Sequence, residues 1–152
     1  MATSAERRVS ELAIVLPPLP SPGGNYVPVK TVGRLVYLSG VISTNRSGII
    51  TGTVGVDRSI EDGYKAARAC ALTHLAILRK HLGSLDVIKS IVSVNGYVNA
   101  APGFADSPKV INGASDLFVE LFGESGRHVR AAIGVSALPH NALVETQITV
   151  EI

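Results

Sequence analysis

The sequence predicts an α+β domain in which one mixed β-sheet carries two helices on a single face. Its 152 residues are enough for one domain with a substantial core. Two segments repeat apolar residues with the period of a helix, and the segments that flank and separate them are rich in β-branched residues. No internal repeat or low-complexity tract indicates another architecture.

The N-terminal segment has a composition that resists helix formation, because four prolines and two glycines lie near its end. We therefore expect an extended segment over residues 1–24 and a single domain over residues 25–152. The domain opens with β-forming residues on both sides of Gly33, which predicts a hairpin. The polar, glycine-rich stretch that follows, residues 43–55, has room for one short strand.

The two helices are predicted from apolar residues that recur every three or four positions. The first helix covers about residues 60–82 and ends at Gly83. Asp57 or Ser59 can cap it, because a short side-chain oxygen accepts a hydrogen bond from the first free amides. The second helix covers about residues 108–122 and is also followed by a glycine.

Three further strands complete the predicted sheet. One covers residues 87–98, between the helices, and the last two cover 129–138 and 143–152. We expect the turn at 139–141 to join the last two strands into a second hairpin. Alternation along the final strand places Glu145 on the face opposite its valines and isoleucines. Helices can cover only the apolar face, so water or a neighbouring subunit meets the face of Glu145.

Arg130 and Glu145 are isolated charges on otherwise apolar strands. A buried cation is costly unless an anion meets it. One interpretation is a structural ion pair between Arg130 and Glu145 or an acid of a neighbour. The other is that Arg130 binds a ligand carboxylate or phosphate while Glu145 acts as an acid or base.

The run R-A-A-I-G-V-S-A-L-P-H-N-A-L-V-E, residues 130–145, resembles a known signature. It is similar to the C-terminal signature of the YjgF/YER057c/UK114 family, the Rid family of reactive-imine deaminases. In that family an arginine precedes a glycine-valine strand, and Leu-Pro precedes Val-Glu. Upstream, Gly24-Asn25-Tyr26 and the segment 33–40 resemble the opening hairpin of the same family, so the resemblance covers about residues 22–152.

The resemblance implies a chorismate-mutase-like fold, a homotrimer whose sheets face a central β-barrel, and sites between subunits. It implies hydrolysis of a reactive imine or enamine to a 2-keto acid and ammonia, without a cofactor or metal. By the same resemblance Arg130 binds the substrate carboxylate and Glu145 is the catalytic acidic residue. The implied substrate-binding positions are Tyr26, Ser39, Gly40 and Ala132.

The sequence departs from the deaminase pattern at several positions. Val41 stands where the deaminases usually carry glutamine, and Pro102 lies in a stretch that they fill with an Asn-Asp-Phe-like turn. His128 lies in a segment where they tend to have a proline pair, on the same strand face as Arg130. These differences indicate a distinct branch. The alternative function is therefore a non-catalytic trimer that binds small carboxylates, with endoribonuclease activity as a weaker third hypothesis.

Composition limits the possible partners. Hydrophobic residues make up 46% of the chain and charged residues 17%, which is apolar for a monomer and favours a homo-oligomer. The basic residues are scattered, there is no Trp, and the aromatic content is 5%, so we expect no nucleic-acid partner. No apolar run is long enough for a membrane helix and the N-terminus lacks a secretory pattern, so we expect a cytoplasmic protein.

Overall fold

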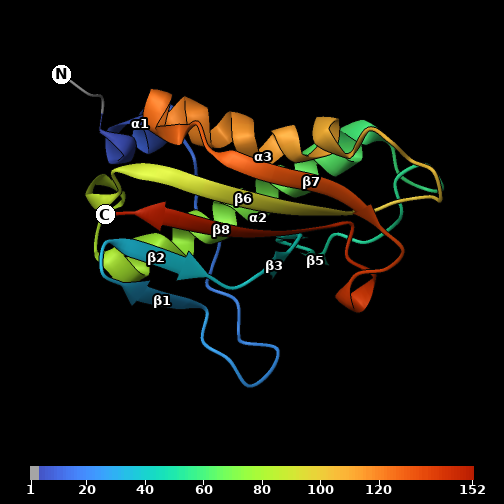
Figure 1. The fold of residues 1–152 in the computed structure, drawn as a ribbon, viewed down its shortest axis with the longest axis horizontal. Helices are drawn as coiled ribbons and strands as arrows, with labels where there is room; N and C mark the ends of the chain where they lie inside the picture. The colour runs from blue at the N-terminus through green and yellow to red at the C-terminus, as the bar shows by residue number, and fades with distance from the viewer. Residues whose placement is uncertain (1–3) are drawn as a thin grey trace.

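The computed structural model describes residues 4–152, which form a mixed sheet covered by helices on one face (Figure 1). The sheet has six strands in the order β1-β2-β8-β6-β7, with β3 also paired to β8. Its strands are β1 Val29–Val32, β2 Leu35–Leu38, β3 Val41–Ile42, β6 Ser90–Asn99, β7 Val129–Val135 and β8 Val144–Glu151. A separate small hairpin consists of β4 Thr44–Asn45 and β5 Gly48–Ile49.

Three α-helices cover the sheet: α1 Ala5–Glu11, α2 Ile60–Leu82 and α3 Ser107–Phe122. Short 3-10 turns lie at Leu85–Val87, Gly123–Gly126 and Pro139–Asn141. The helices α2 and α3 pack against each other and against β8 and β6. None of the helices within residues 4–152 is both long and apolar enough to cross a membrane.

Helix α2 begins and ends where the sequence predicts. The Ser59 hydroxyl accepts a hydrogen bond of 3.0 Å from the Asp62 N–H, and the Asp62 carboxylate accepts one of 2.9 Å from the Ser59 N–H. This reciprocal pair satisfies two amides that the first turn leaves free. At the other end Gly83 adopts a left-handed conformation, φ 84°, that glycine reaches without a steric penalty. Ser59 is therefore the cap, rather than Asp57.

Strand β8 lies in the centre of the sheet and carries the alternation that its sequence predicts. Val144, Ile148 and Val150 are buried beneath the helices, together with Thr146. Glu145 points to the opposite face of the sheet, and its cross-strand partner in β6 is Tyr97. The expected separation of an apolar face from a polar one is confirmed.

The expected second hairpin is wrong. Strand β7 pairs with β6 in parallel, and β8 runs antiparallel between β6 and β2. The physical reason is the crossover: β6, α3 and β7 form a β-α-β unit, which brings β7 back beside β6 as a parallel neighbour. The chain then passes through the turn at Pro139–Asn141 and returns on the other side of β6.

The N-terminal segment is also different from the prediction. Residues 5–11 form α1, whose N-terminus is capped by the Ser4 hydroxyl, an acceptor 3.1 Å from the Arg7 N–H. Ala5 and Val9 are buried in the core. Glu6 binds the Arg79 guanidinium at 2.6 Å, which joins α1 to α2. The prolines lie beyond the helix and limit only the later part of the segment, which remains irregular.

Two smaller boundaries also differ from the prediction. The stretch 43–55 holds two short paired strands, β4 and β5, rather than one. The strand predicted at 87–98 begins three residues later, because the chain first forms the 3-10 turn at Leu85–Val87.

Close packing of α2 on α3 depends on Gly113. A Cβ at this position would overlap the carbonyl oxygen of Tyr64 and lie 3.2 Å from the Cβ of Ala67. Backbone cannot move aside as a flexible side chain can. We expect Gly113→Ala to lower the free energy of unfolding by about 2 kcal/mol and the Tm by roughly 6 °C, measured by circular dichroism. Glu120→Ala, on the exposed side of α3, is the control. An unchanged Tm for Gly113→Ala would contradict this packing.

Candidate functional site

A cavity of about 460 Å³ lies beside β8, where the N-terminal loop, the junction between β2 and β3, and α2 meet. Its volume falls within the range of small-molecule sites, roughly 300–1,000 Å³. Four of the residues predicted for the site line it: Tyr26, Ser39, Gly40 and Glu145. Glu145 lies more than a hundred positions after the other three in the sequence, and the pairing of β3 with β8 brings it beside them.

Glu145 is the acidic residue of the cavity. It is half-buried, and burial raises the pKa of its carboxyl above the ordinary value. No lysine, arginine or histidine of residues 4–152 forms an ion pair with it. A carboxyl with a raised pKa and no fixed cation holds a proton more readily than an exposed carboxyl, which suits a general acid or base.

Gly40 allows this carboxyl to approach the chain between β2 and β3. A Cβ at Gly40 would lie 2.9 Å from Oε2 of Glu145, closer than a side chain can normally sit. The small residue is therefore needed for space, and Gly40 is not among the glycines with positive φ. Any larger residue at this position would move the Glu145 carboxyl.

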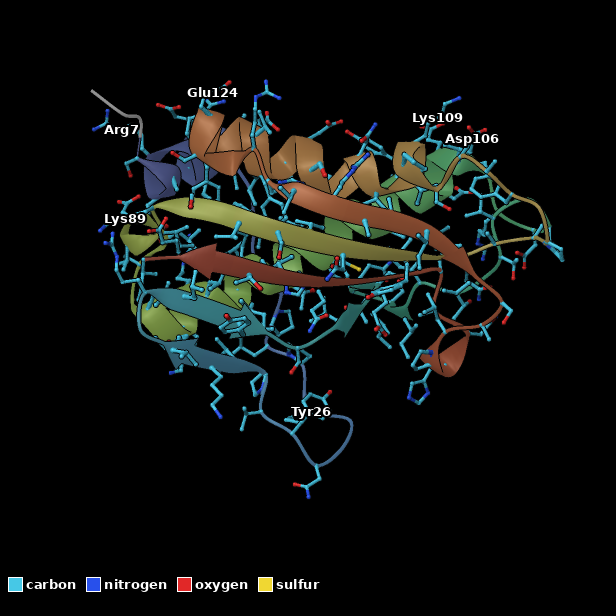
Figure 2. All side chains as sticks on the ribbon, viewed as in Figure 1. Arg7, Tyr26, Lys89, Asp106, Lys109 and Glu124 are labelled. Carbon is cyan, nitrogen blue, oxygen red and sulfur yellow. The ribbon has the colours of Figure 1, made fainter. Side chains whose placement is uncertain are left out.

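The cavity wall formed by the N-terminal loop is held by hydrogen bonds. The Ser39 hydroxyl donates to the Val27 carbonyl at 2.7 Å, and the Ser39 N–H donates to the Pro28 carbonyl at 2.9 Å. The Tyr26 hydroxyl accepts from the Gly23 N–H at 3.1 Å. Figure 2 shows Tyr26 on this loop, which projects from the body of the domain beyond β1. Ser39 thus fixes the loop that presents the tyrosine.

Arg130 does not reach the cavity of its own chain. In β7 it is aligned with Val94 of β6, which is buried beneath the helices, whereas Glu145 is aligned with Tyr97 on the opposite face. The Arg130 guanidinium instead binds α3, donating to Ser115 Oγ at 3.0 Å and to the Pro108 carbonyl at 3.3 Å. The interpretation of Arg130 and Glu145 as an ion pair within one chain is therefore wrong.

The other two candidates on β7 also lie outside the cavity. Ala132 is half-buried on the helix-covered face, two residues beyond Arg130. His128 binds Ser115 and the Gly126 carbonyl on the same side. The structure thus divides the predicted site residues into a cavity group around Glu145 and a β7 group around Arg130.

Sequence reasoning missed His140 and the apolar wall of the cavity. His140 lines the cavity from the turn before β8, where it has a positive φ of 55°. Its position directly after Leu-Pro in the signature is the available signal, although the sequence predicts only a turn there. The wall is formed by aliphatic side chains from three elements, β3, β5 and α2, which no local sequence pattern connects: Val41, Ile42, Ile49 and Ile77.

The buried Asn99 holds the turn that carries His140. Its side-chain amide donates to the Ala142 carbonyl at 3.2 Å and to Asn141 Oδ1 at 3.3 Å. Pro102, in the same departing segment of the sequence, does not line the cavity, whereas Val41 does. Of the two departures, only Val41 thus changes the cavity wall.

The cavity contains few ionisable groups. Among the described residues that line it, only Tyr26, His140 and Glu145 can ionise, and neither lysine nor arginine is present. No group of three His, Cys, Asp or Glu side chains within residues 4–152 is placed to hold a metal ion. The described lining therefore offers a negatively charged ligand no permanently charged cation.

Comparison with known proteins gives the family. Residues 6–152 match the family model described as "YjgF/chorismate_mutase-like, putative endoribonuclease". The chain belongs to this family. The predicted Rid resemblance and chorismate-mutase-like fold are therefore confirmed. This YjgF-family chain is also 40% identical over 158 residues to Protein TCP17 of Trypanosoma cruzi. The match covers 100% of this chain and 99% of the relative.

Two solved structures show how the YjgF-family chain relates to its neighbours. A putative endoribonuclease from Shewanella oneidensis is 32% identical and has a TM-score of 0.94, with 99% of this chain and 100% of that chain covered. RidA from the Antarctic bacterium Psychrobacter is 25% identical, with a TM-score of 0.62 over 88% of this chain and 94% of that one. The chain is therefore structurally nearer to the Shewanella protein than to this RidA.

The raised pKa of Glu145 predicts a destabilising charge. Because its folded-state pKa lies above the unfolded one, ionised Glu145 weakens the fold at neutral pH, and this effect disappears as pH falls below both values. We expect Glu145→Gln to raise the Tm at neutral pH, with the difference lost near the ordinary carboxyl pKa of 4.5. Thermal melts between about pH 4 and about pH 8 measure this.

A matched control lies on the same face of β8. Glu151 is ion-paired with Arg34 at 3.5 Å, so Glu151→Gln should not stabilise the protein. A Tm for Glu145→Gln below that of the wild type at neutral pH would mean that the carboxylate has a stabilising cationic partner.

Proposed function

We propose that this protein hydrolyses reactive imines or enamines derived from amino acids to 2-keto acids and ammonia, at sites between the subunits of a homotrimer. The observation that carries the proposal is the division of the site. Glu145 lines a cavity without lysine or arginine, and Arg130 lies on the other face of the sheet without an anion among the described residues. Arg130 provides the cation that the Glu145 cavity lacks, and the cavity provides a place for the anionic ligand that Arg130 can bind.

Association of copies supports this arrangement. An exposed arginine held only by a hydroxyl and a carbonyl is free to meet an anion, and a planar guanidinium binds both oxygens of a carboxylate. The face of the sheet away from the helices also exposes apolar side chains, including Val129 at 71% and Ile133 at 49%. Exposed apolar surface of this kind favours contact with another subunit. Arg130 of one subunit would then enter the Glu145 cavity of its neighbour.

The reaction uses these two groups in sequence. Arg130 binds the carboxylate of the imino acid and orients its imine carbon toward Glu145. Ionised Glu145 takes a proton from a water molecule while the water oxygen bonds to the carbon of the protonated imine, and the C=N π electrons pass to the nitrogen. Glu145 gives this proton to the nitrogen of the resulting carbinolamine. The carbon–nitrogen bond then breaks as the carbinolamine hydroxyl returns a proton to Glu145, which releases ammonia and a 2-keto acid. The raised pKa of Glu145 suits both transfers.

The apolar wall indicates the side chain of the substrate. Val41, Ile42 and Ile77 present aliphatic surface to the cavity. Burying an apolar side chain there is favourable, by about 0.8 kcal/mol for each methylene removed from water. The cavity volume of about 460 Å³ also exceeds what a three-carbon imino acid fills. The substrates favoured by this wall are imino acids with larger apolar side chains.

A second candidate is a non-catalytic trimer that binds small carboxylates. Val41 favours it, because an apolar residue stands in the wall where the deaminases usually carry glutamine. Endoribonuclease activity, which the family description mentions, has less support, since the described lining of the cavity offers no lysine or arginine for a phosphate backbone.

The proposal predicts that ammonia release depends on Arg130. Freshly generated 2-imino acids serve as substrates, and light scattering checks that each variant keeps its oligomeric mass. We expect Arg130→Ala to lower kcat/KM by about 100-fold, because the substrate carboxylate loses its charged partner, and Arg130→Lys to recover part of the rate.

Arg127→Ala is the matched control, because Arg127 is exposed and paired with Glu124 at the surface. Equal rates in the wild type and Arg130→Ala would contradict the proposed role of Arg130. Binding of keto acids by the wild type without any turnover would support the carboxylate-binding trimer.

A further inference from the structure

Arg130 is part of a hydrogen-bonded group that the proposed reaction does not explain. The group contains His128, Ser115 and the carbonyl of Gly126, and it lies between the start of β7 and the middle of α3. Ser115 lies in α3 and Arg130 in β7, two elements that pack against each other, and His128 directly precedes β7. Ser115 is the common member, since its Oγ lies 2.8 Å from His128 Nε2 and 3.0 Å from Arg130 Nη1.

The donor and acceptor roles in this group are fixed by the Gly126 carbonyl at one end of the chain of hydrogen bonds. The Gly126 carbonyl can only accept, so His128 Nδ1, 2.7 Å away, carries the proton. Neutral His128 then has an unprotonated Nε2, which accepts from the Ser115 hydroxyl. Ser115 Oγ in turn accepts from Arg130 Nη1. Every donor faces an acceptor, so the chain runs from Arg130 through Ser115 and His128 to the Gly126 carbonyl.

The packing of His128 keeps this chain fixed. Its ring is half-buried and lies perpendicular to the Phe118 ring, with the centroids 6.0 Å apart. Burial, together with the charge of Arg130, lowers the pKa of His128, which favours the neutral form that can accept from Ser115. The imidazole is thus held in both position and tautomer.

The Arg130 guanidinium has donors that these hydrogen bonds do not use. Nη1 donates to Ser115 and Nη2 donates to the Pro108 carbonyl at 3.3 Å. A guanidinium has two N–H bonds on each terminal nitrogen, so one on each remains available, as does the Nε N–H. An arginine fixed in this way loses less side-chain entropy when it binds a carboxylate.

We propose that His128 and Ser115 are positioning residues that hold the Arg130 guanidinium in its carboxylate-binding orientation. This inference rests on the proposed function of Arg130. It gives a role to Ser115 and to His128, which lies in a segment where the sequence departs from the deaminase pattern. Neither residue contacts the substrate; both act through Arg130.

The kinetic test uses Ser115→Ala, which removes the central hydroxyl from a helix position where alanine is well tolerated. We expect KM for a 2-imino acid to rise about tenfold with little change in kcat or Tm, because only the orientation of the carboxylate ligand is lost. Ser115→Thr keeps the hydroxyl and should restore KM. Ser125→Ala, an exposed serine in the 3-10 turn after α3, is the control.

A second measurement does not depend on turnover. Nitrogen-15 NMR of the arginine side chains should show slow rotation of the Arg130 guanidinium in the wild type and fast rotation in Ser115→Ala. Arg46, which makes no hydrogen bond or ion pair among the described residues, provides the freely rotating reference. An Arg130 signal in the wild type that rotates as freely as Arg46 would overturn the inference.

The two proposals fail in different ways. If Arg130→Ala keeps the wild-type rate, the proposed function of Arg130 is wrong. If Arg130→Ala loses the rate while Ser115→Ala keeps the wild-type KM, then Arg130 acts without the His128–Ser115 pair, and the positioning role is wrong.

Discussion

The central position of β8 determines most of what this protein can do. Strand β8 pairs with β6 on one side and with β2 and β3 on the other, and its alternate residues form part of the core. A shift of one residue in its register would exchange the buried Thr146 with Glu145 and expose the apolar face. The apolar burial of Val144, Ile148 and Val150 therefore fixes where the carboxyl of Glu145 emerges. The position of Glu145 in the cavity therefore depends on the packing of the core.

The same constraint separates the two charged groups. Parallel pairing with β6 places Arg130 on the helix-covered face of the sheet, whereas antiparallel pairing places Glu145 on the other. Glu145 consequently lies half-buried without a cation, which disfavours its ionised form. Function in this account is linked to a local loss of stability, which is common for catalytic carboxyls. Within one chain, Arg130 and Glu145 therefore lie on opposite faces of the sheet.

Much of the fold could be predicted from local sequence. The helix α2 has a strong period, a Ser59 cap and a terminal glycine, so its bounds follow from residues close together in the chain. The short helix α1 could not be recognised in this way, because seven residues are too few for a clear period and the nearby prolines dominate the composition. The pairing of β7 with β6 depends on the α3 crossover, which is a property of the whole domain.

The candidate site was predictable only in part. The positions of Tyr26, Ser39 and Gly40 came from resemblance to the family, because their residue types gave no indication of a site. Glu145 also stood out as an isolated charge on an apolar strand, and the cavity brings these four residues together. The aliphatic wall and His140 were missed because they join segments that are distant in the sequence. The role of Ser115 depends on packing between α3 and β7, which no sequence pattern reports.

The most direct test of the central claim is complementation between two inactive variants. Arg130→Ala and Glu145→Gln subunits are co-expressed with different tags, and mixed oligomers are purified and assayed for ammonia release from 2-imino acids. If each site of the trimer takes Arg130 from one subunit and Glu145 from its neighbour, every mixed trimer has both groups in one of its three sites. We expect a rate of about a third of the wild type, far above that of either variant alone. Mixed oligomers that remain as inactive as the separate variants would contradict a site shared between subunits.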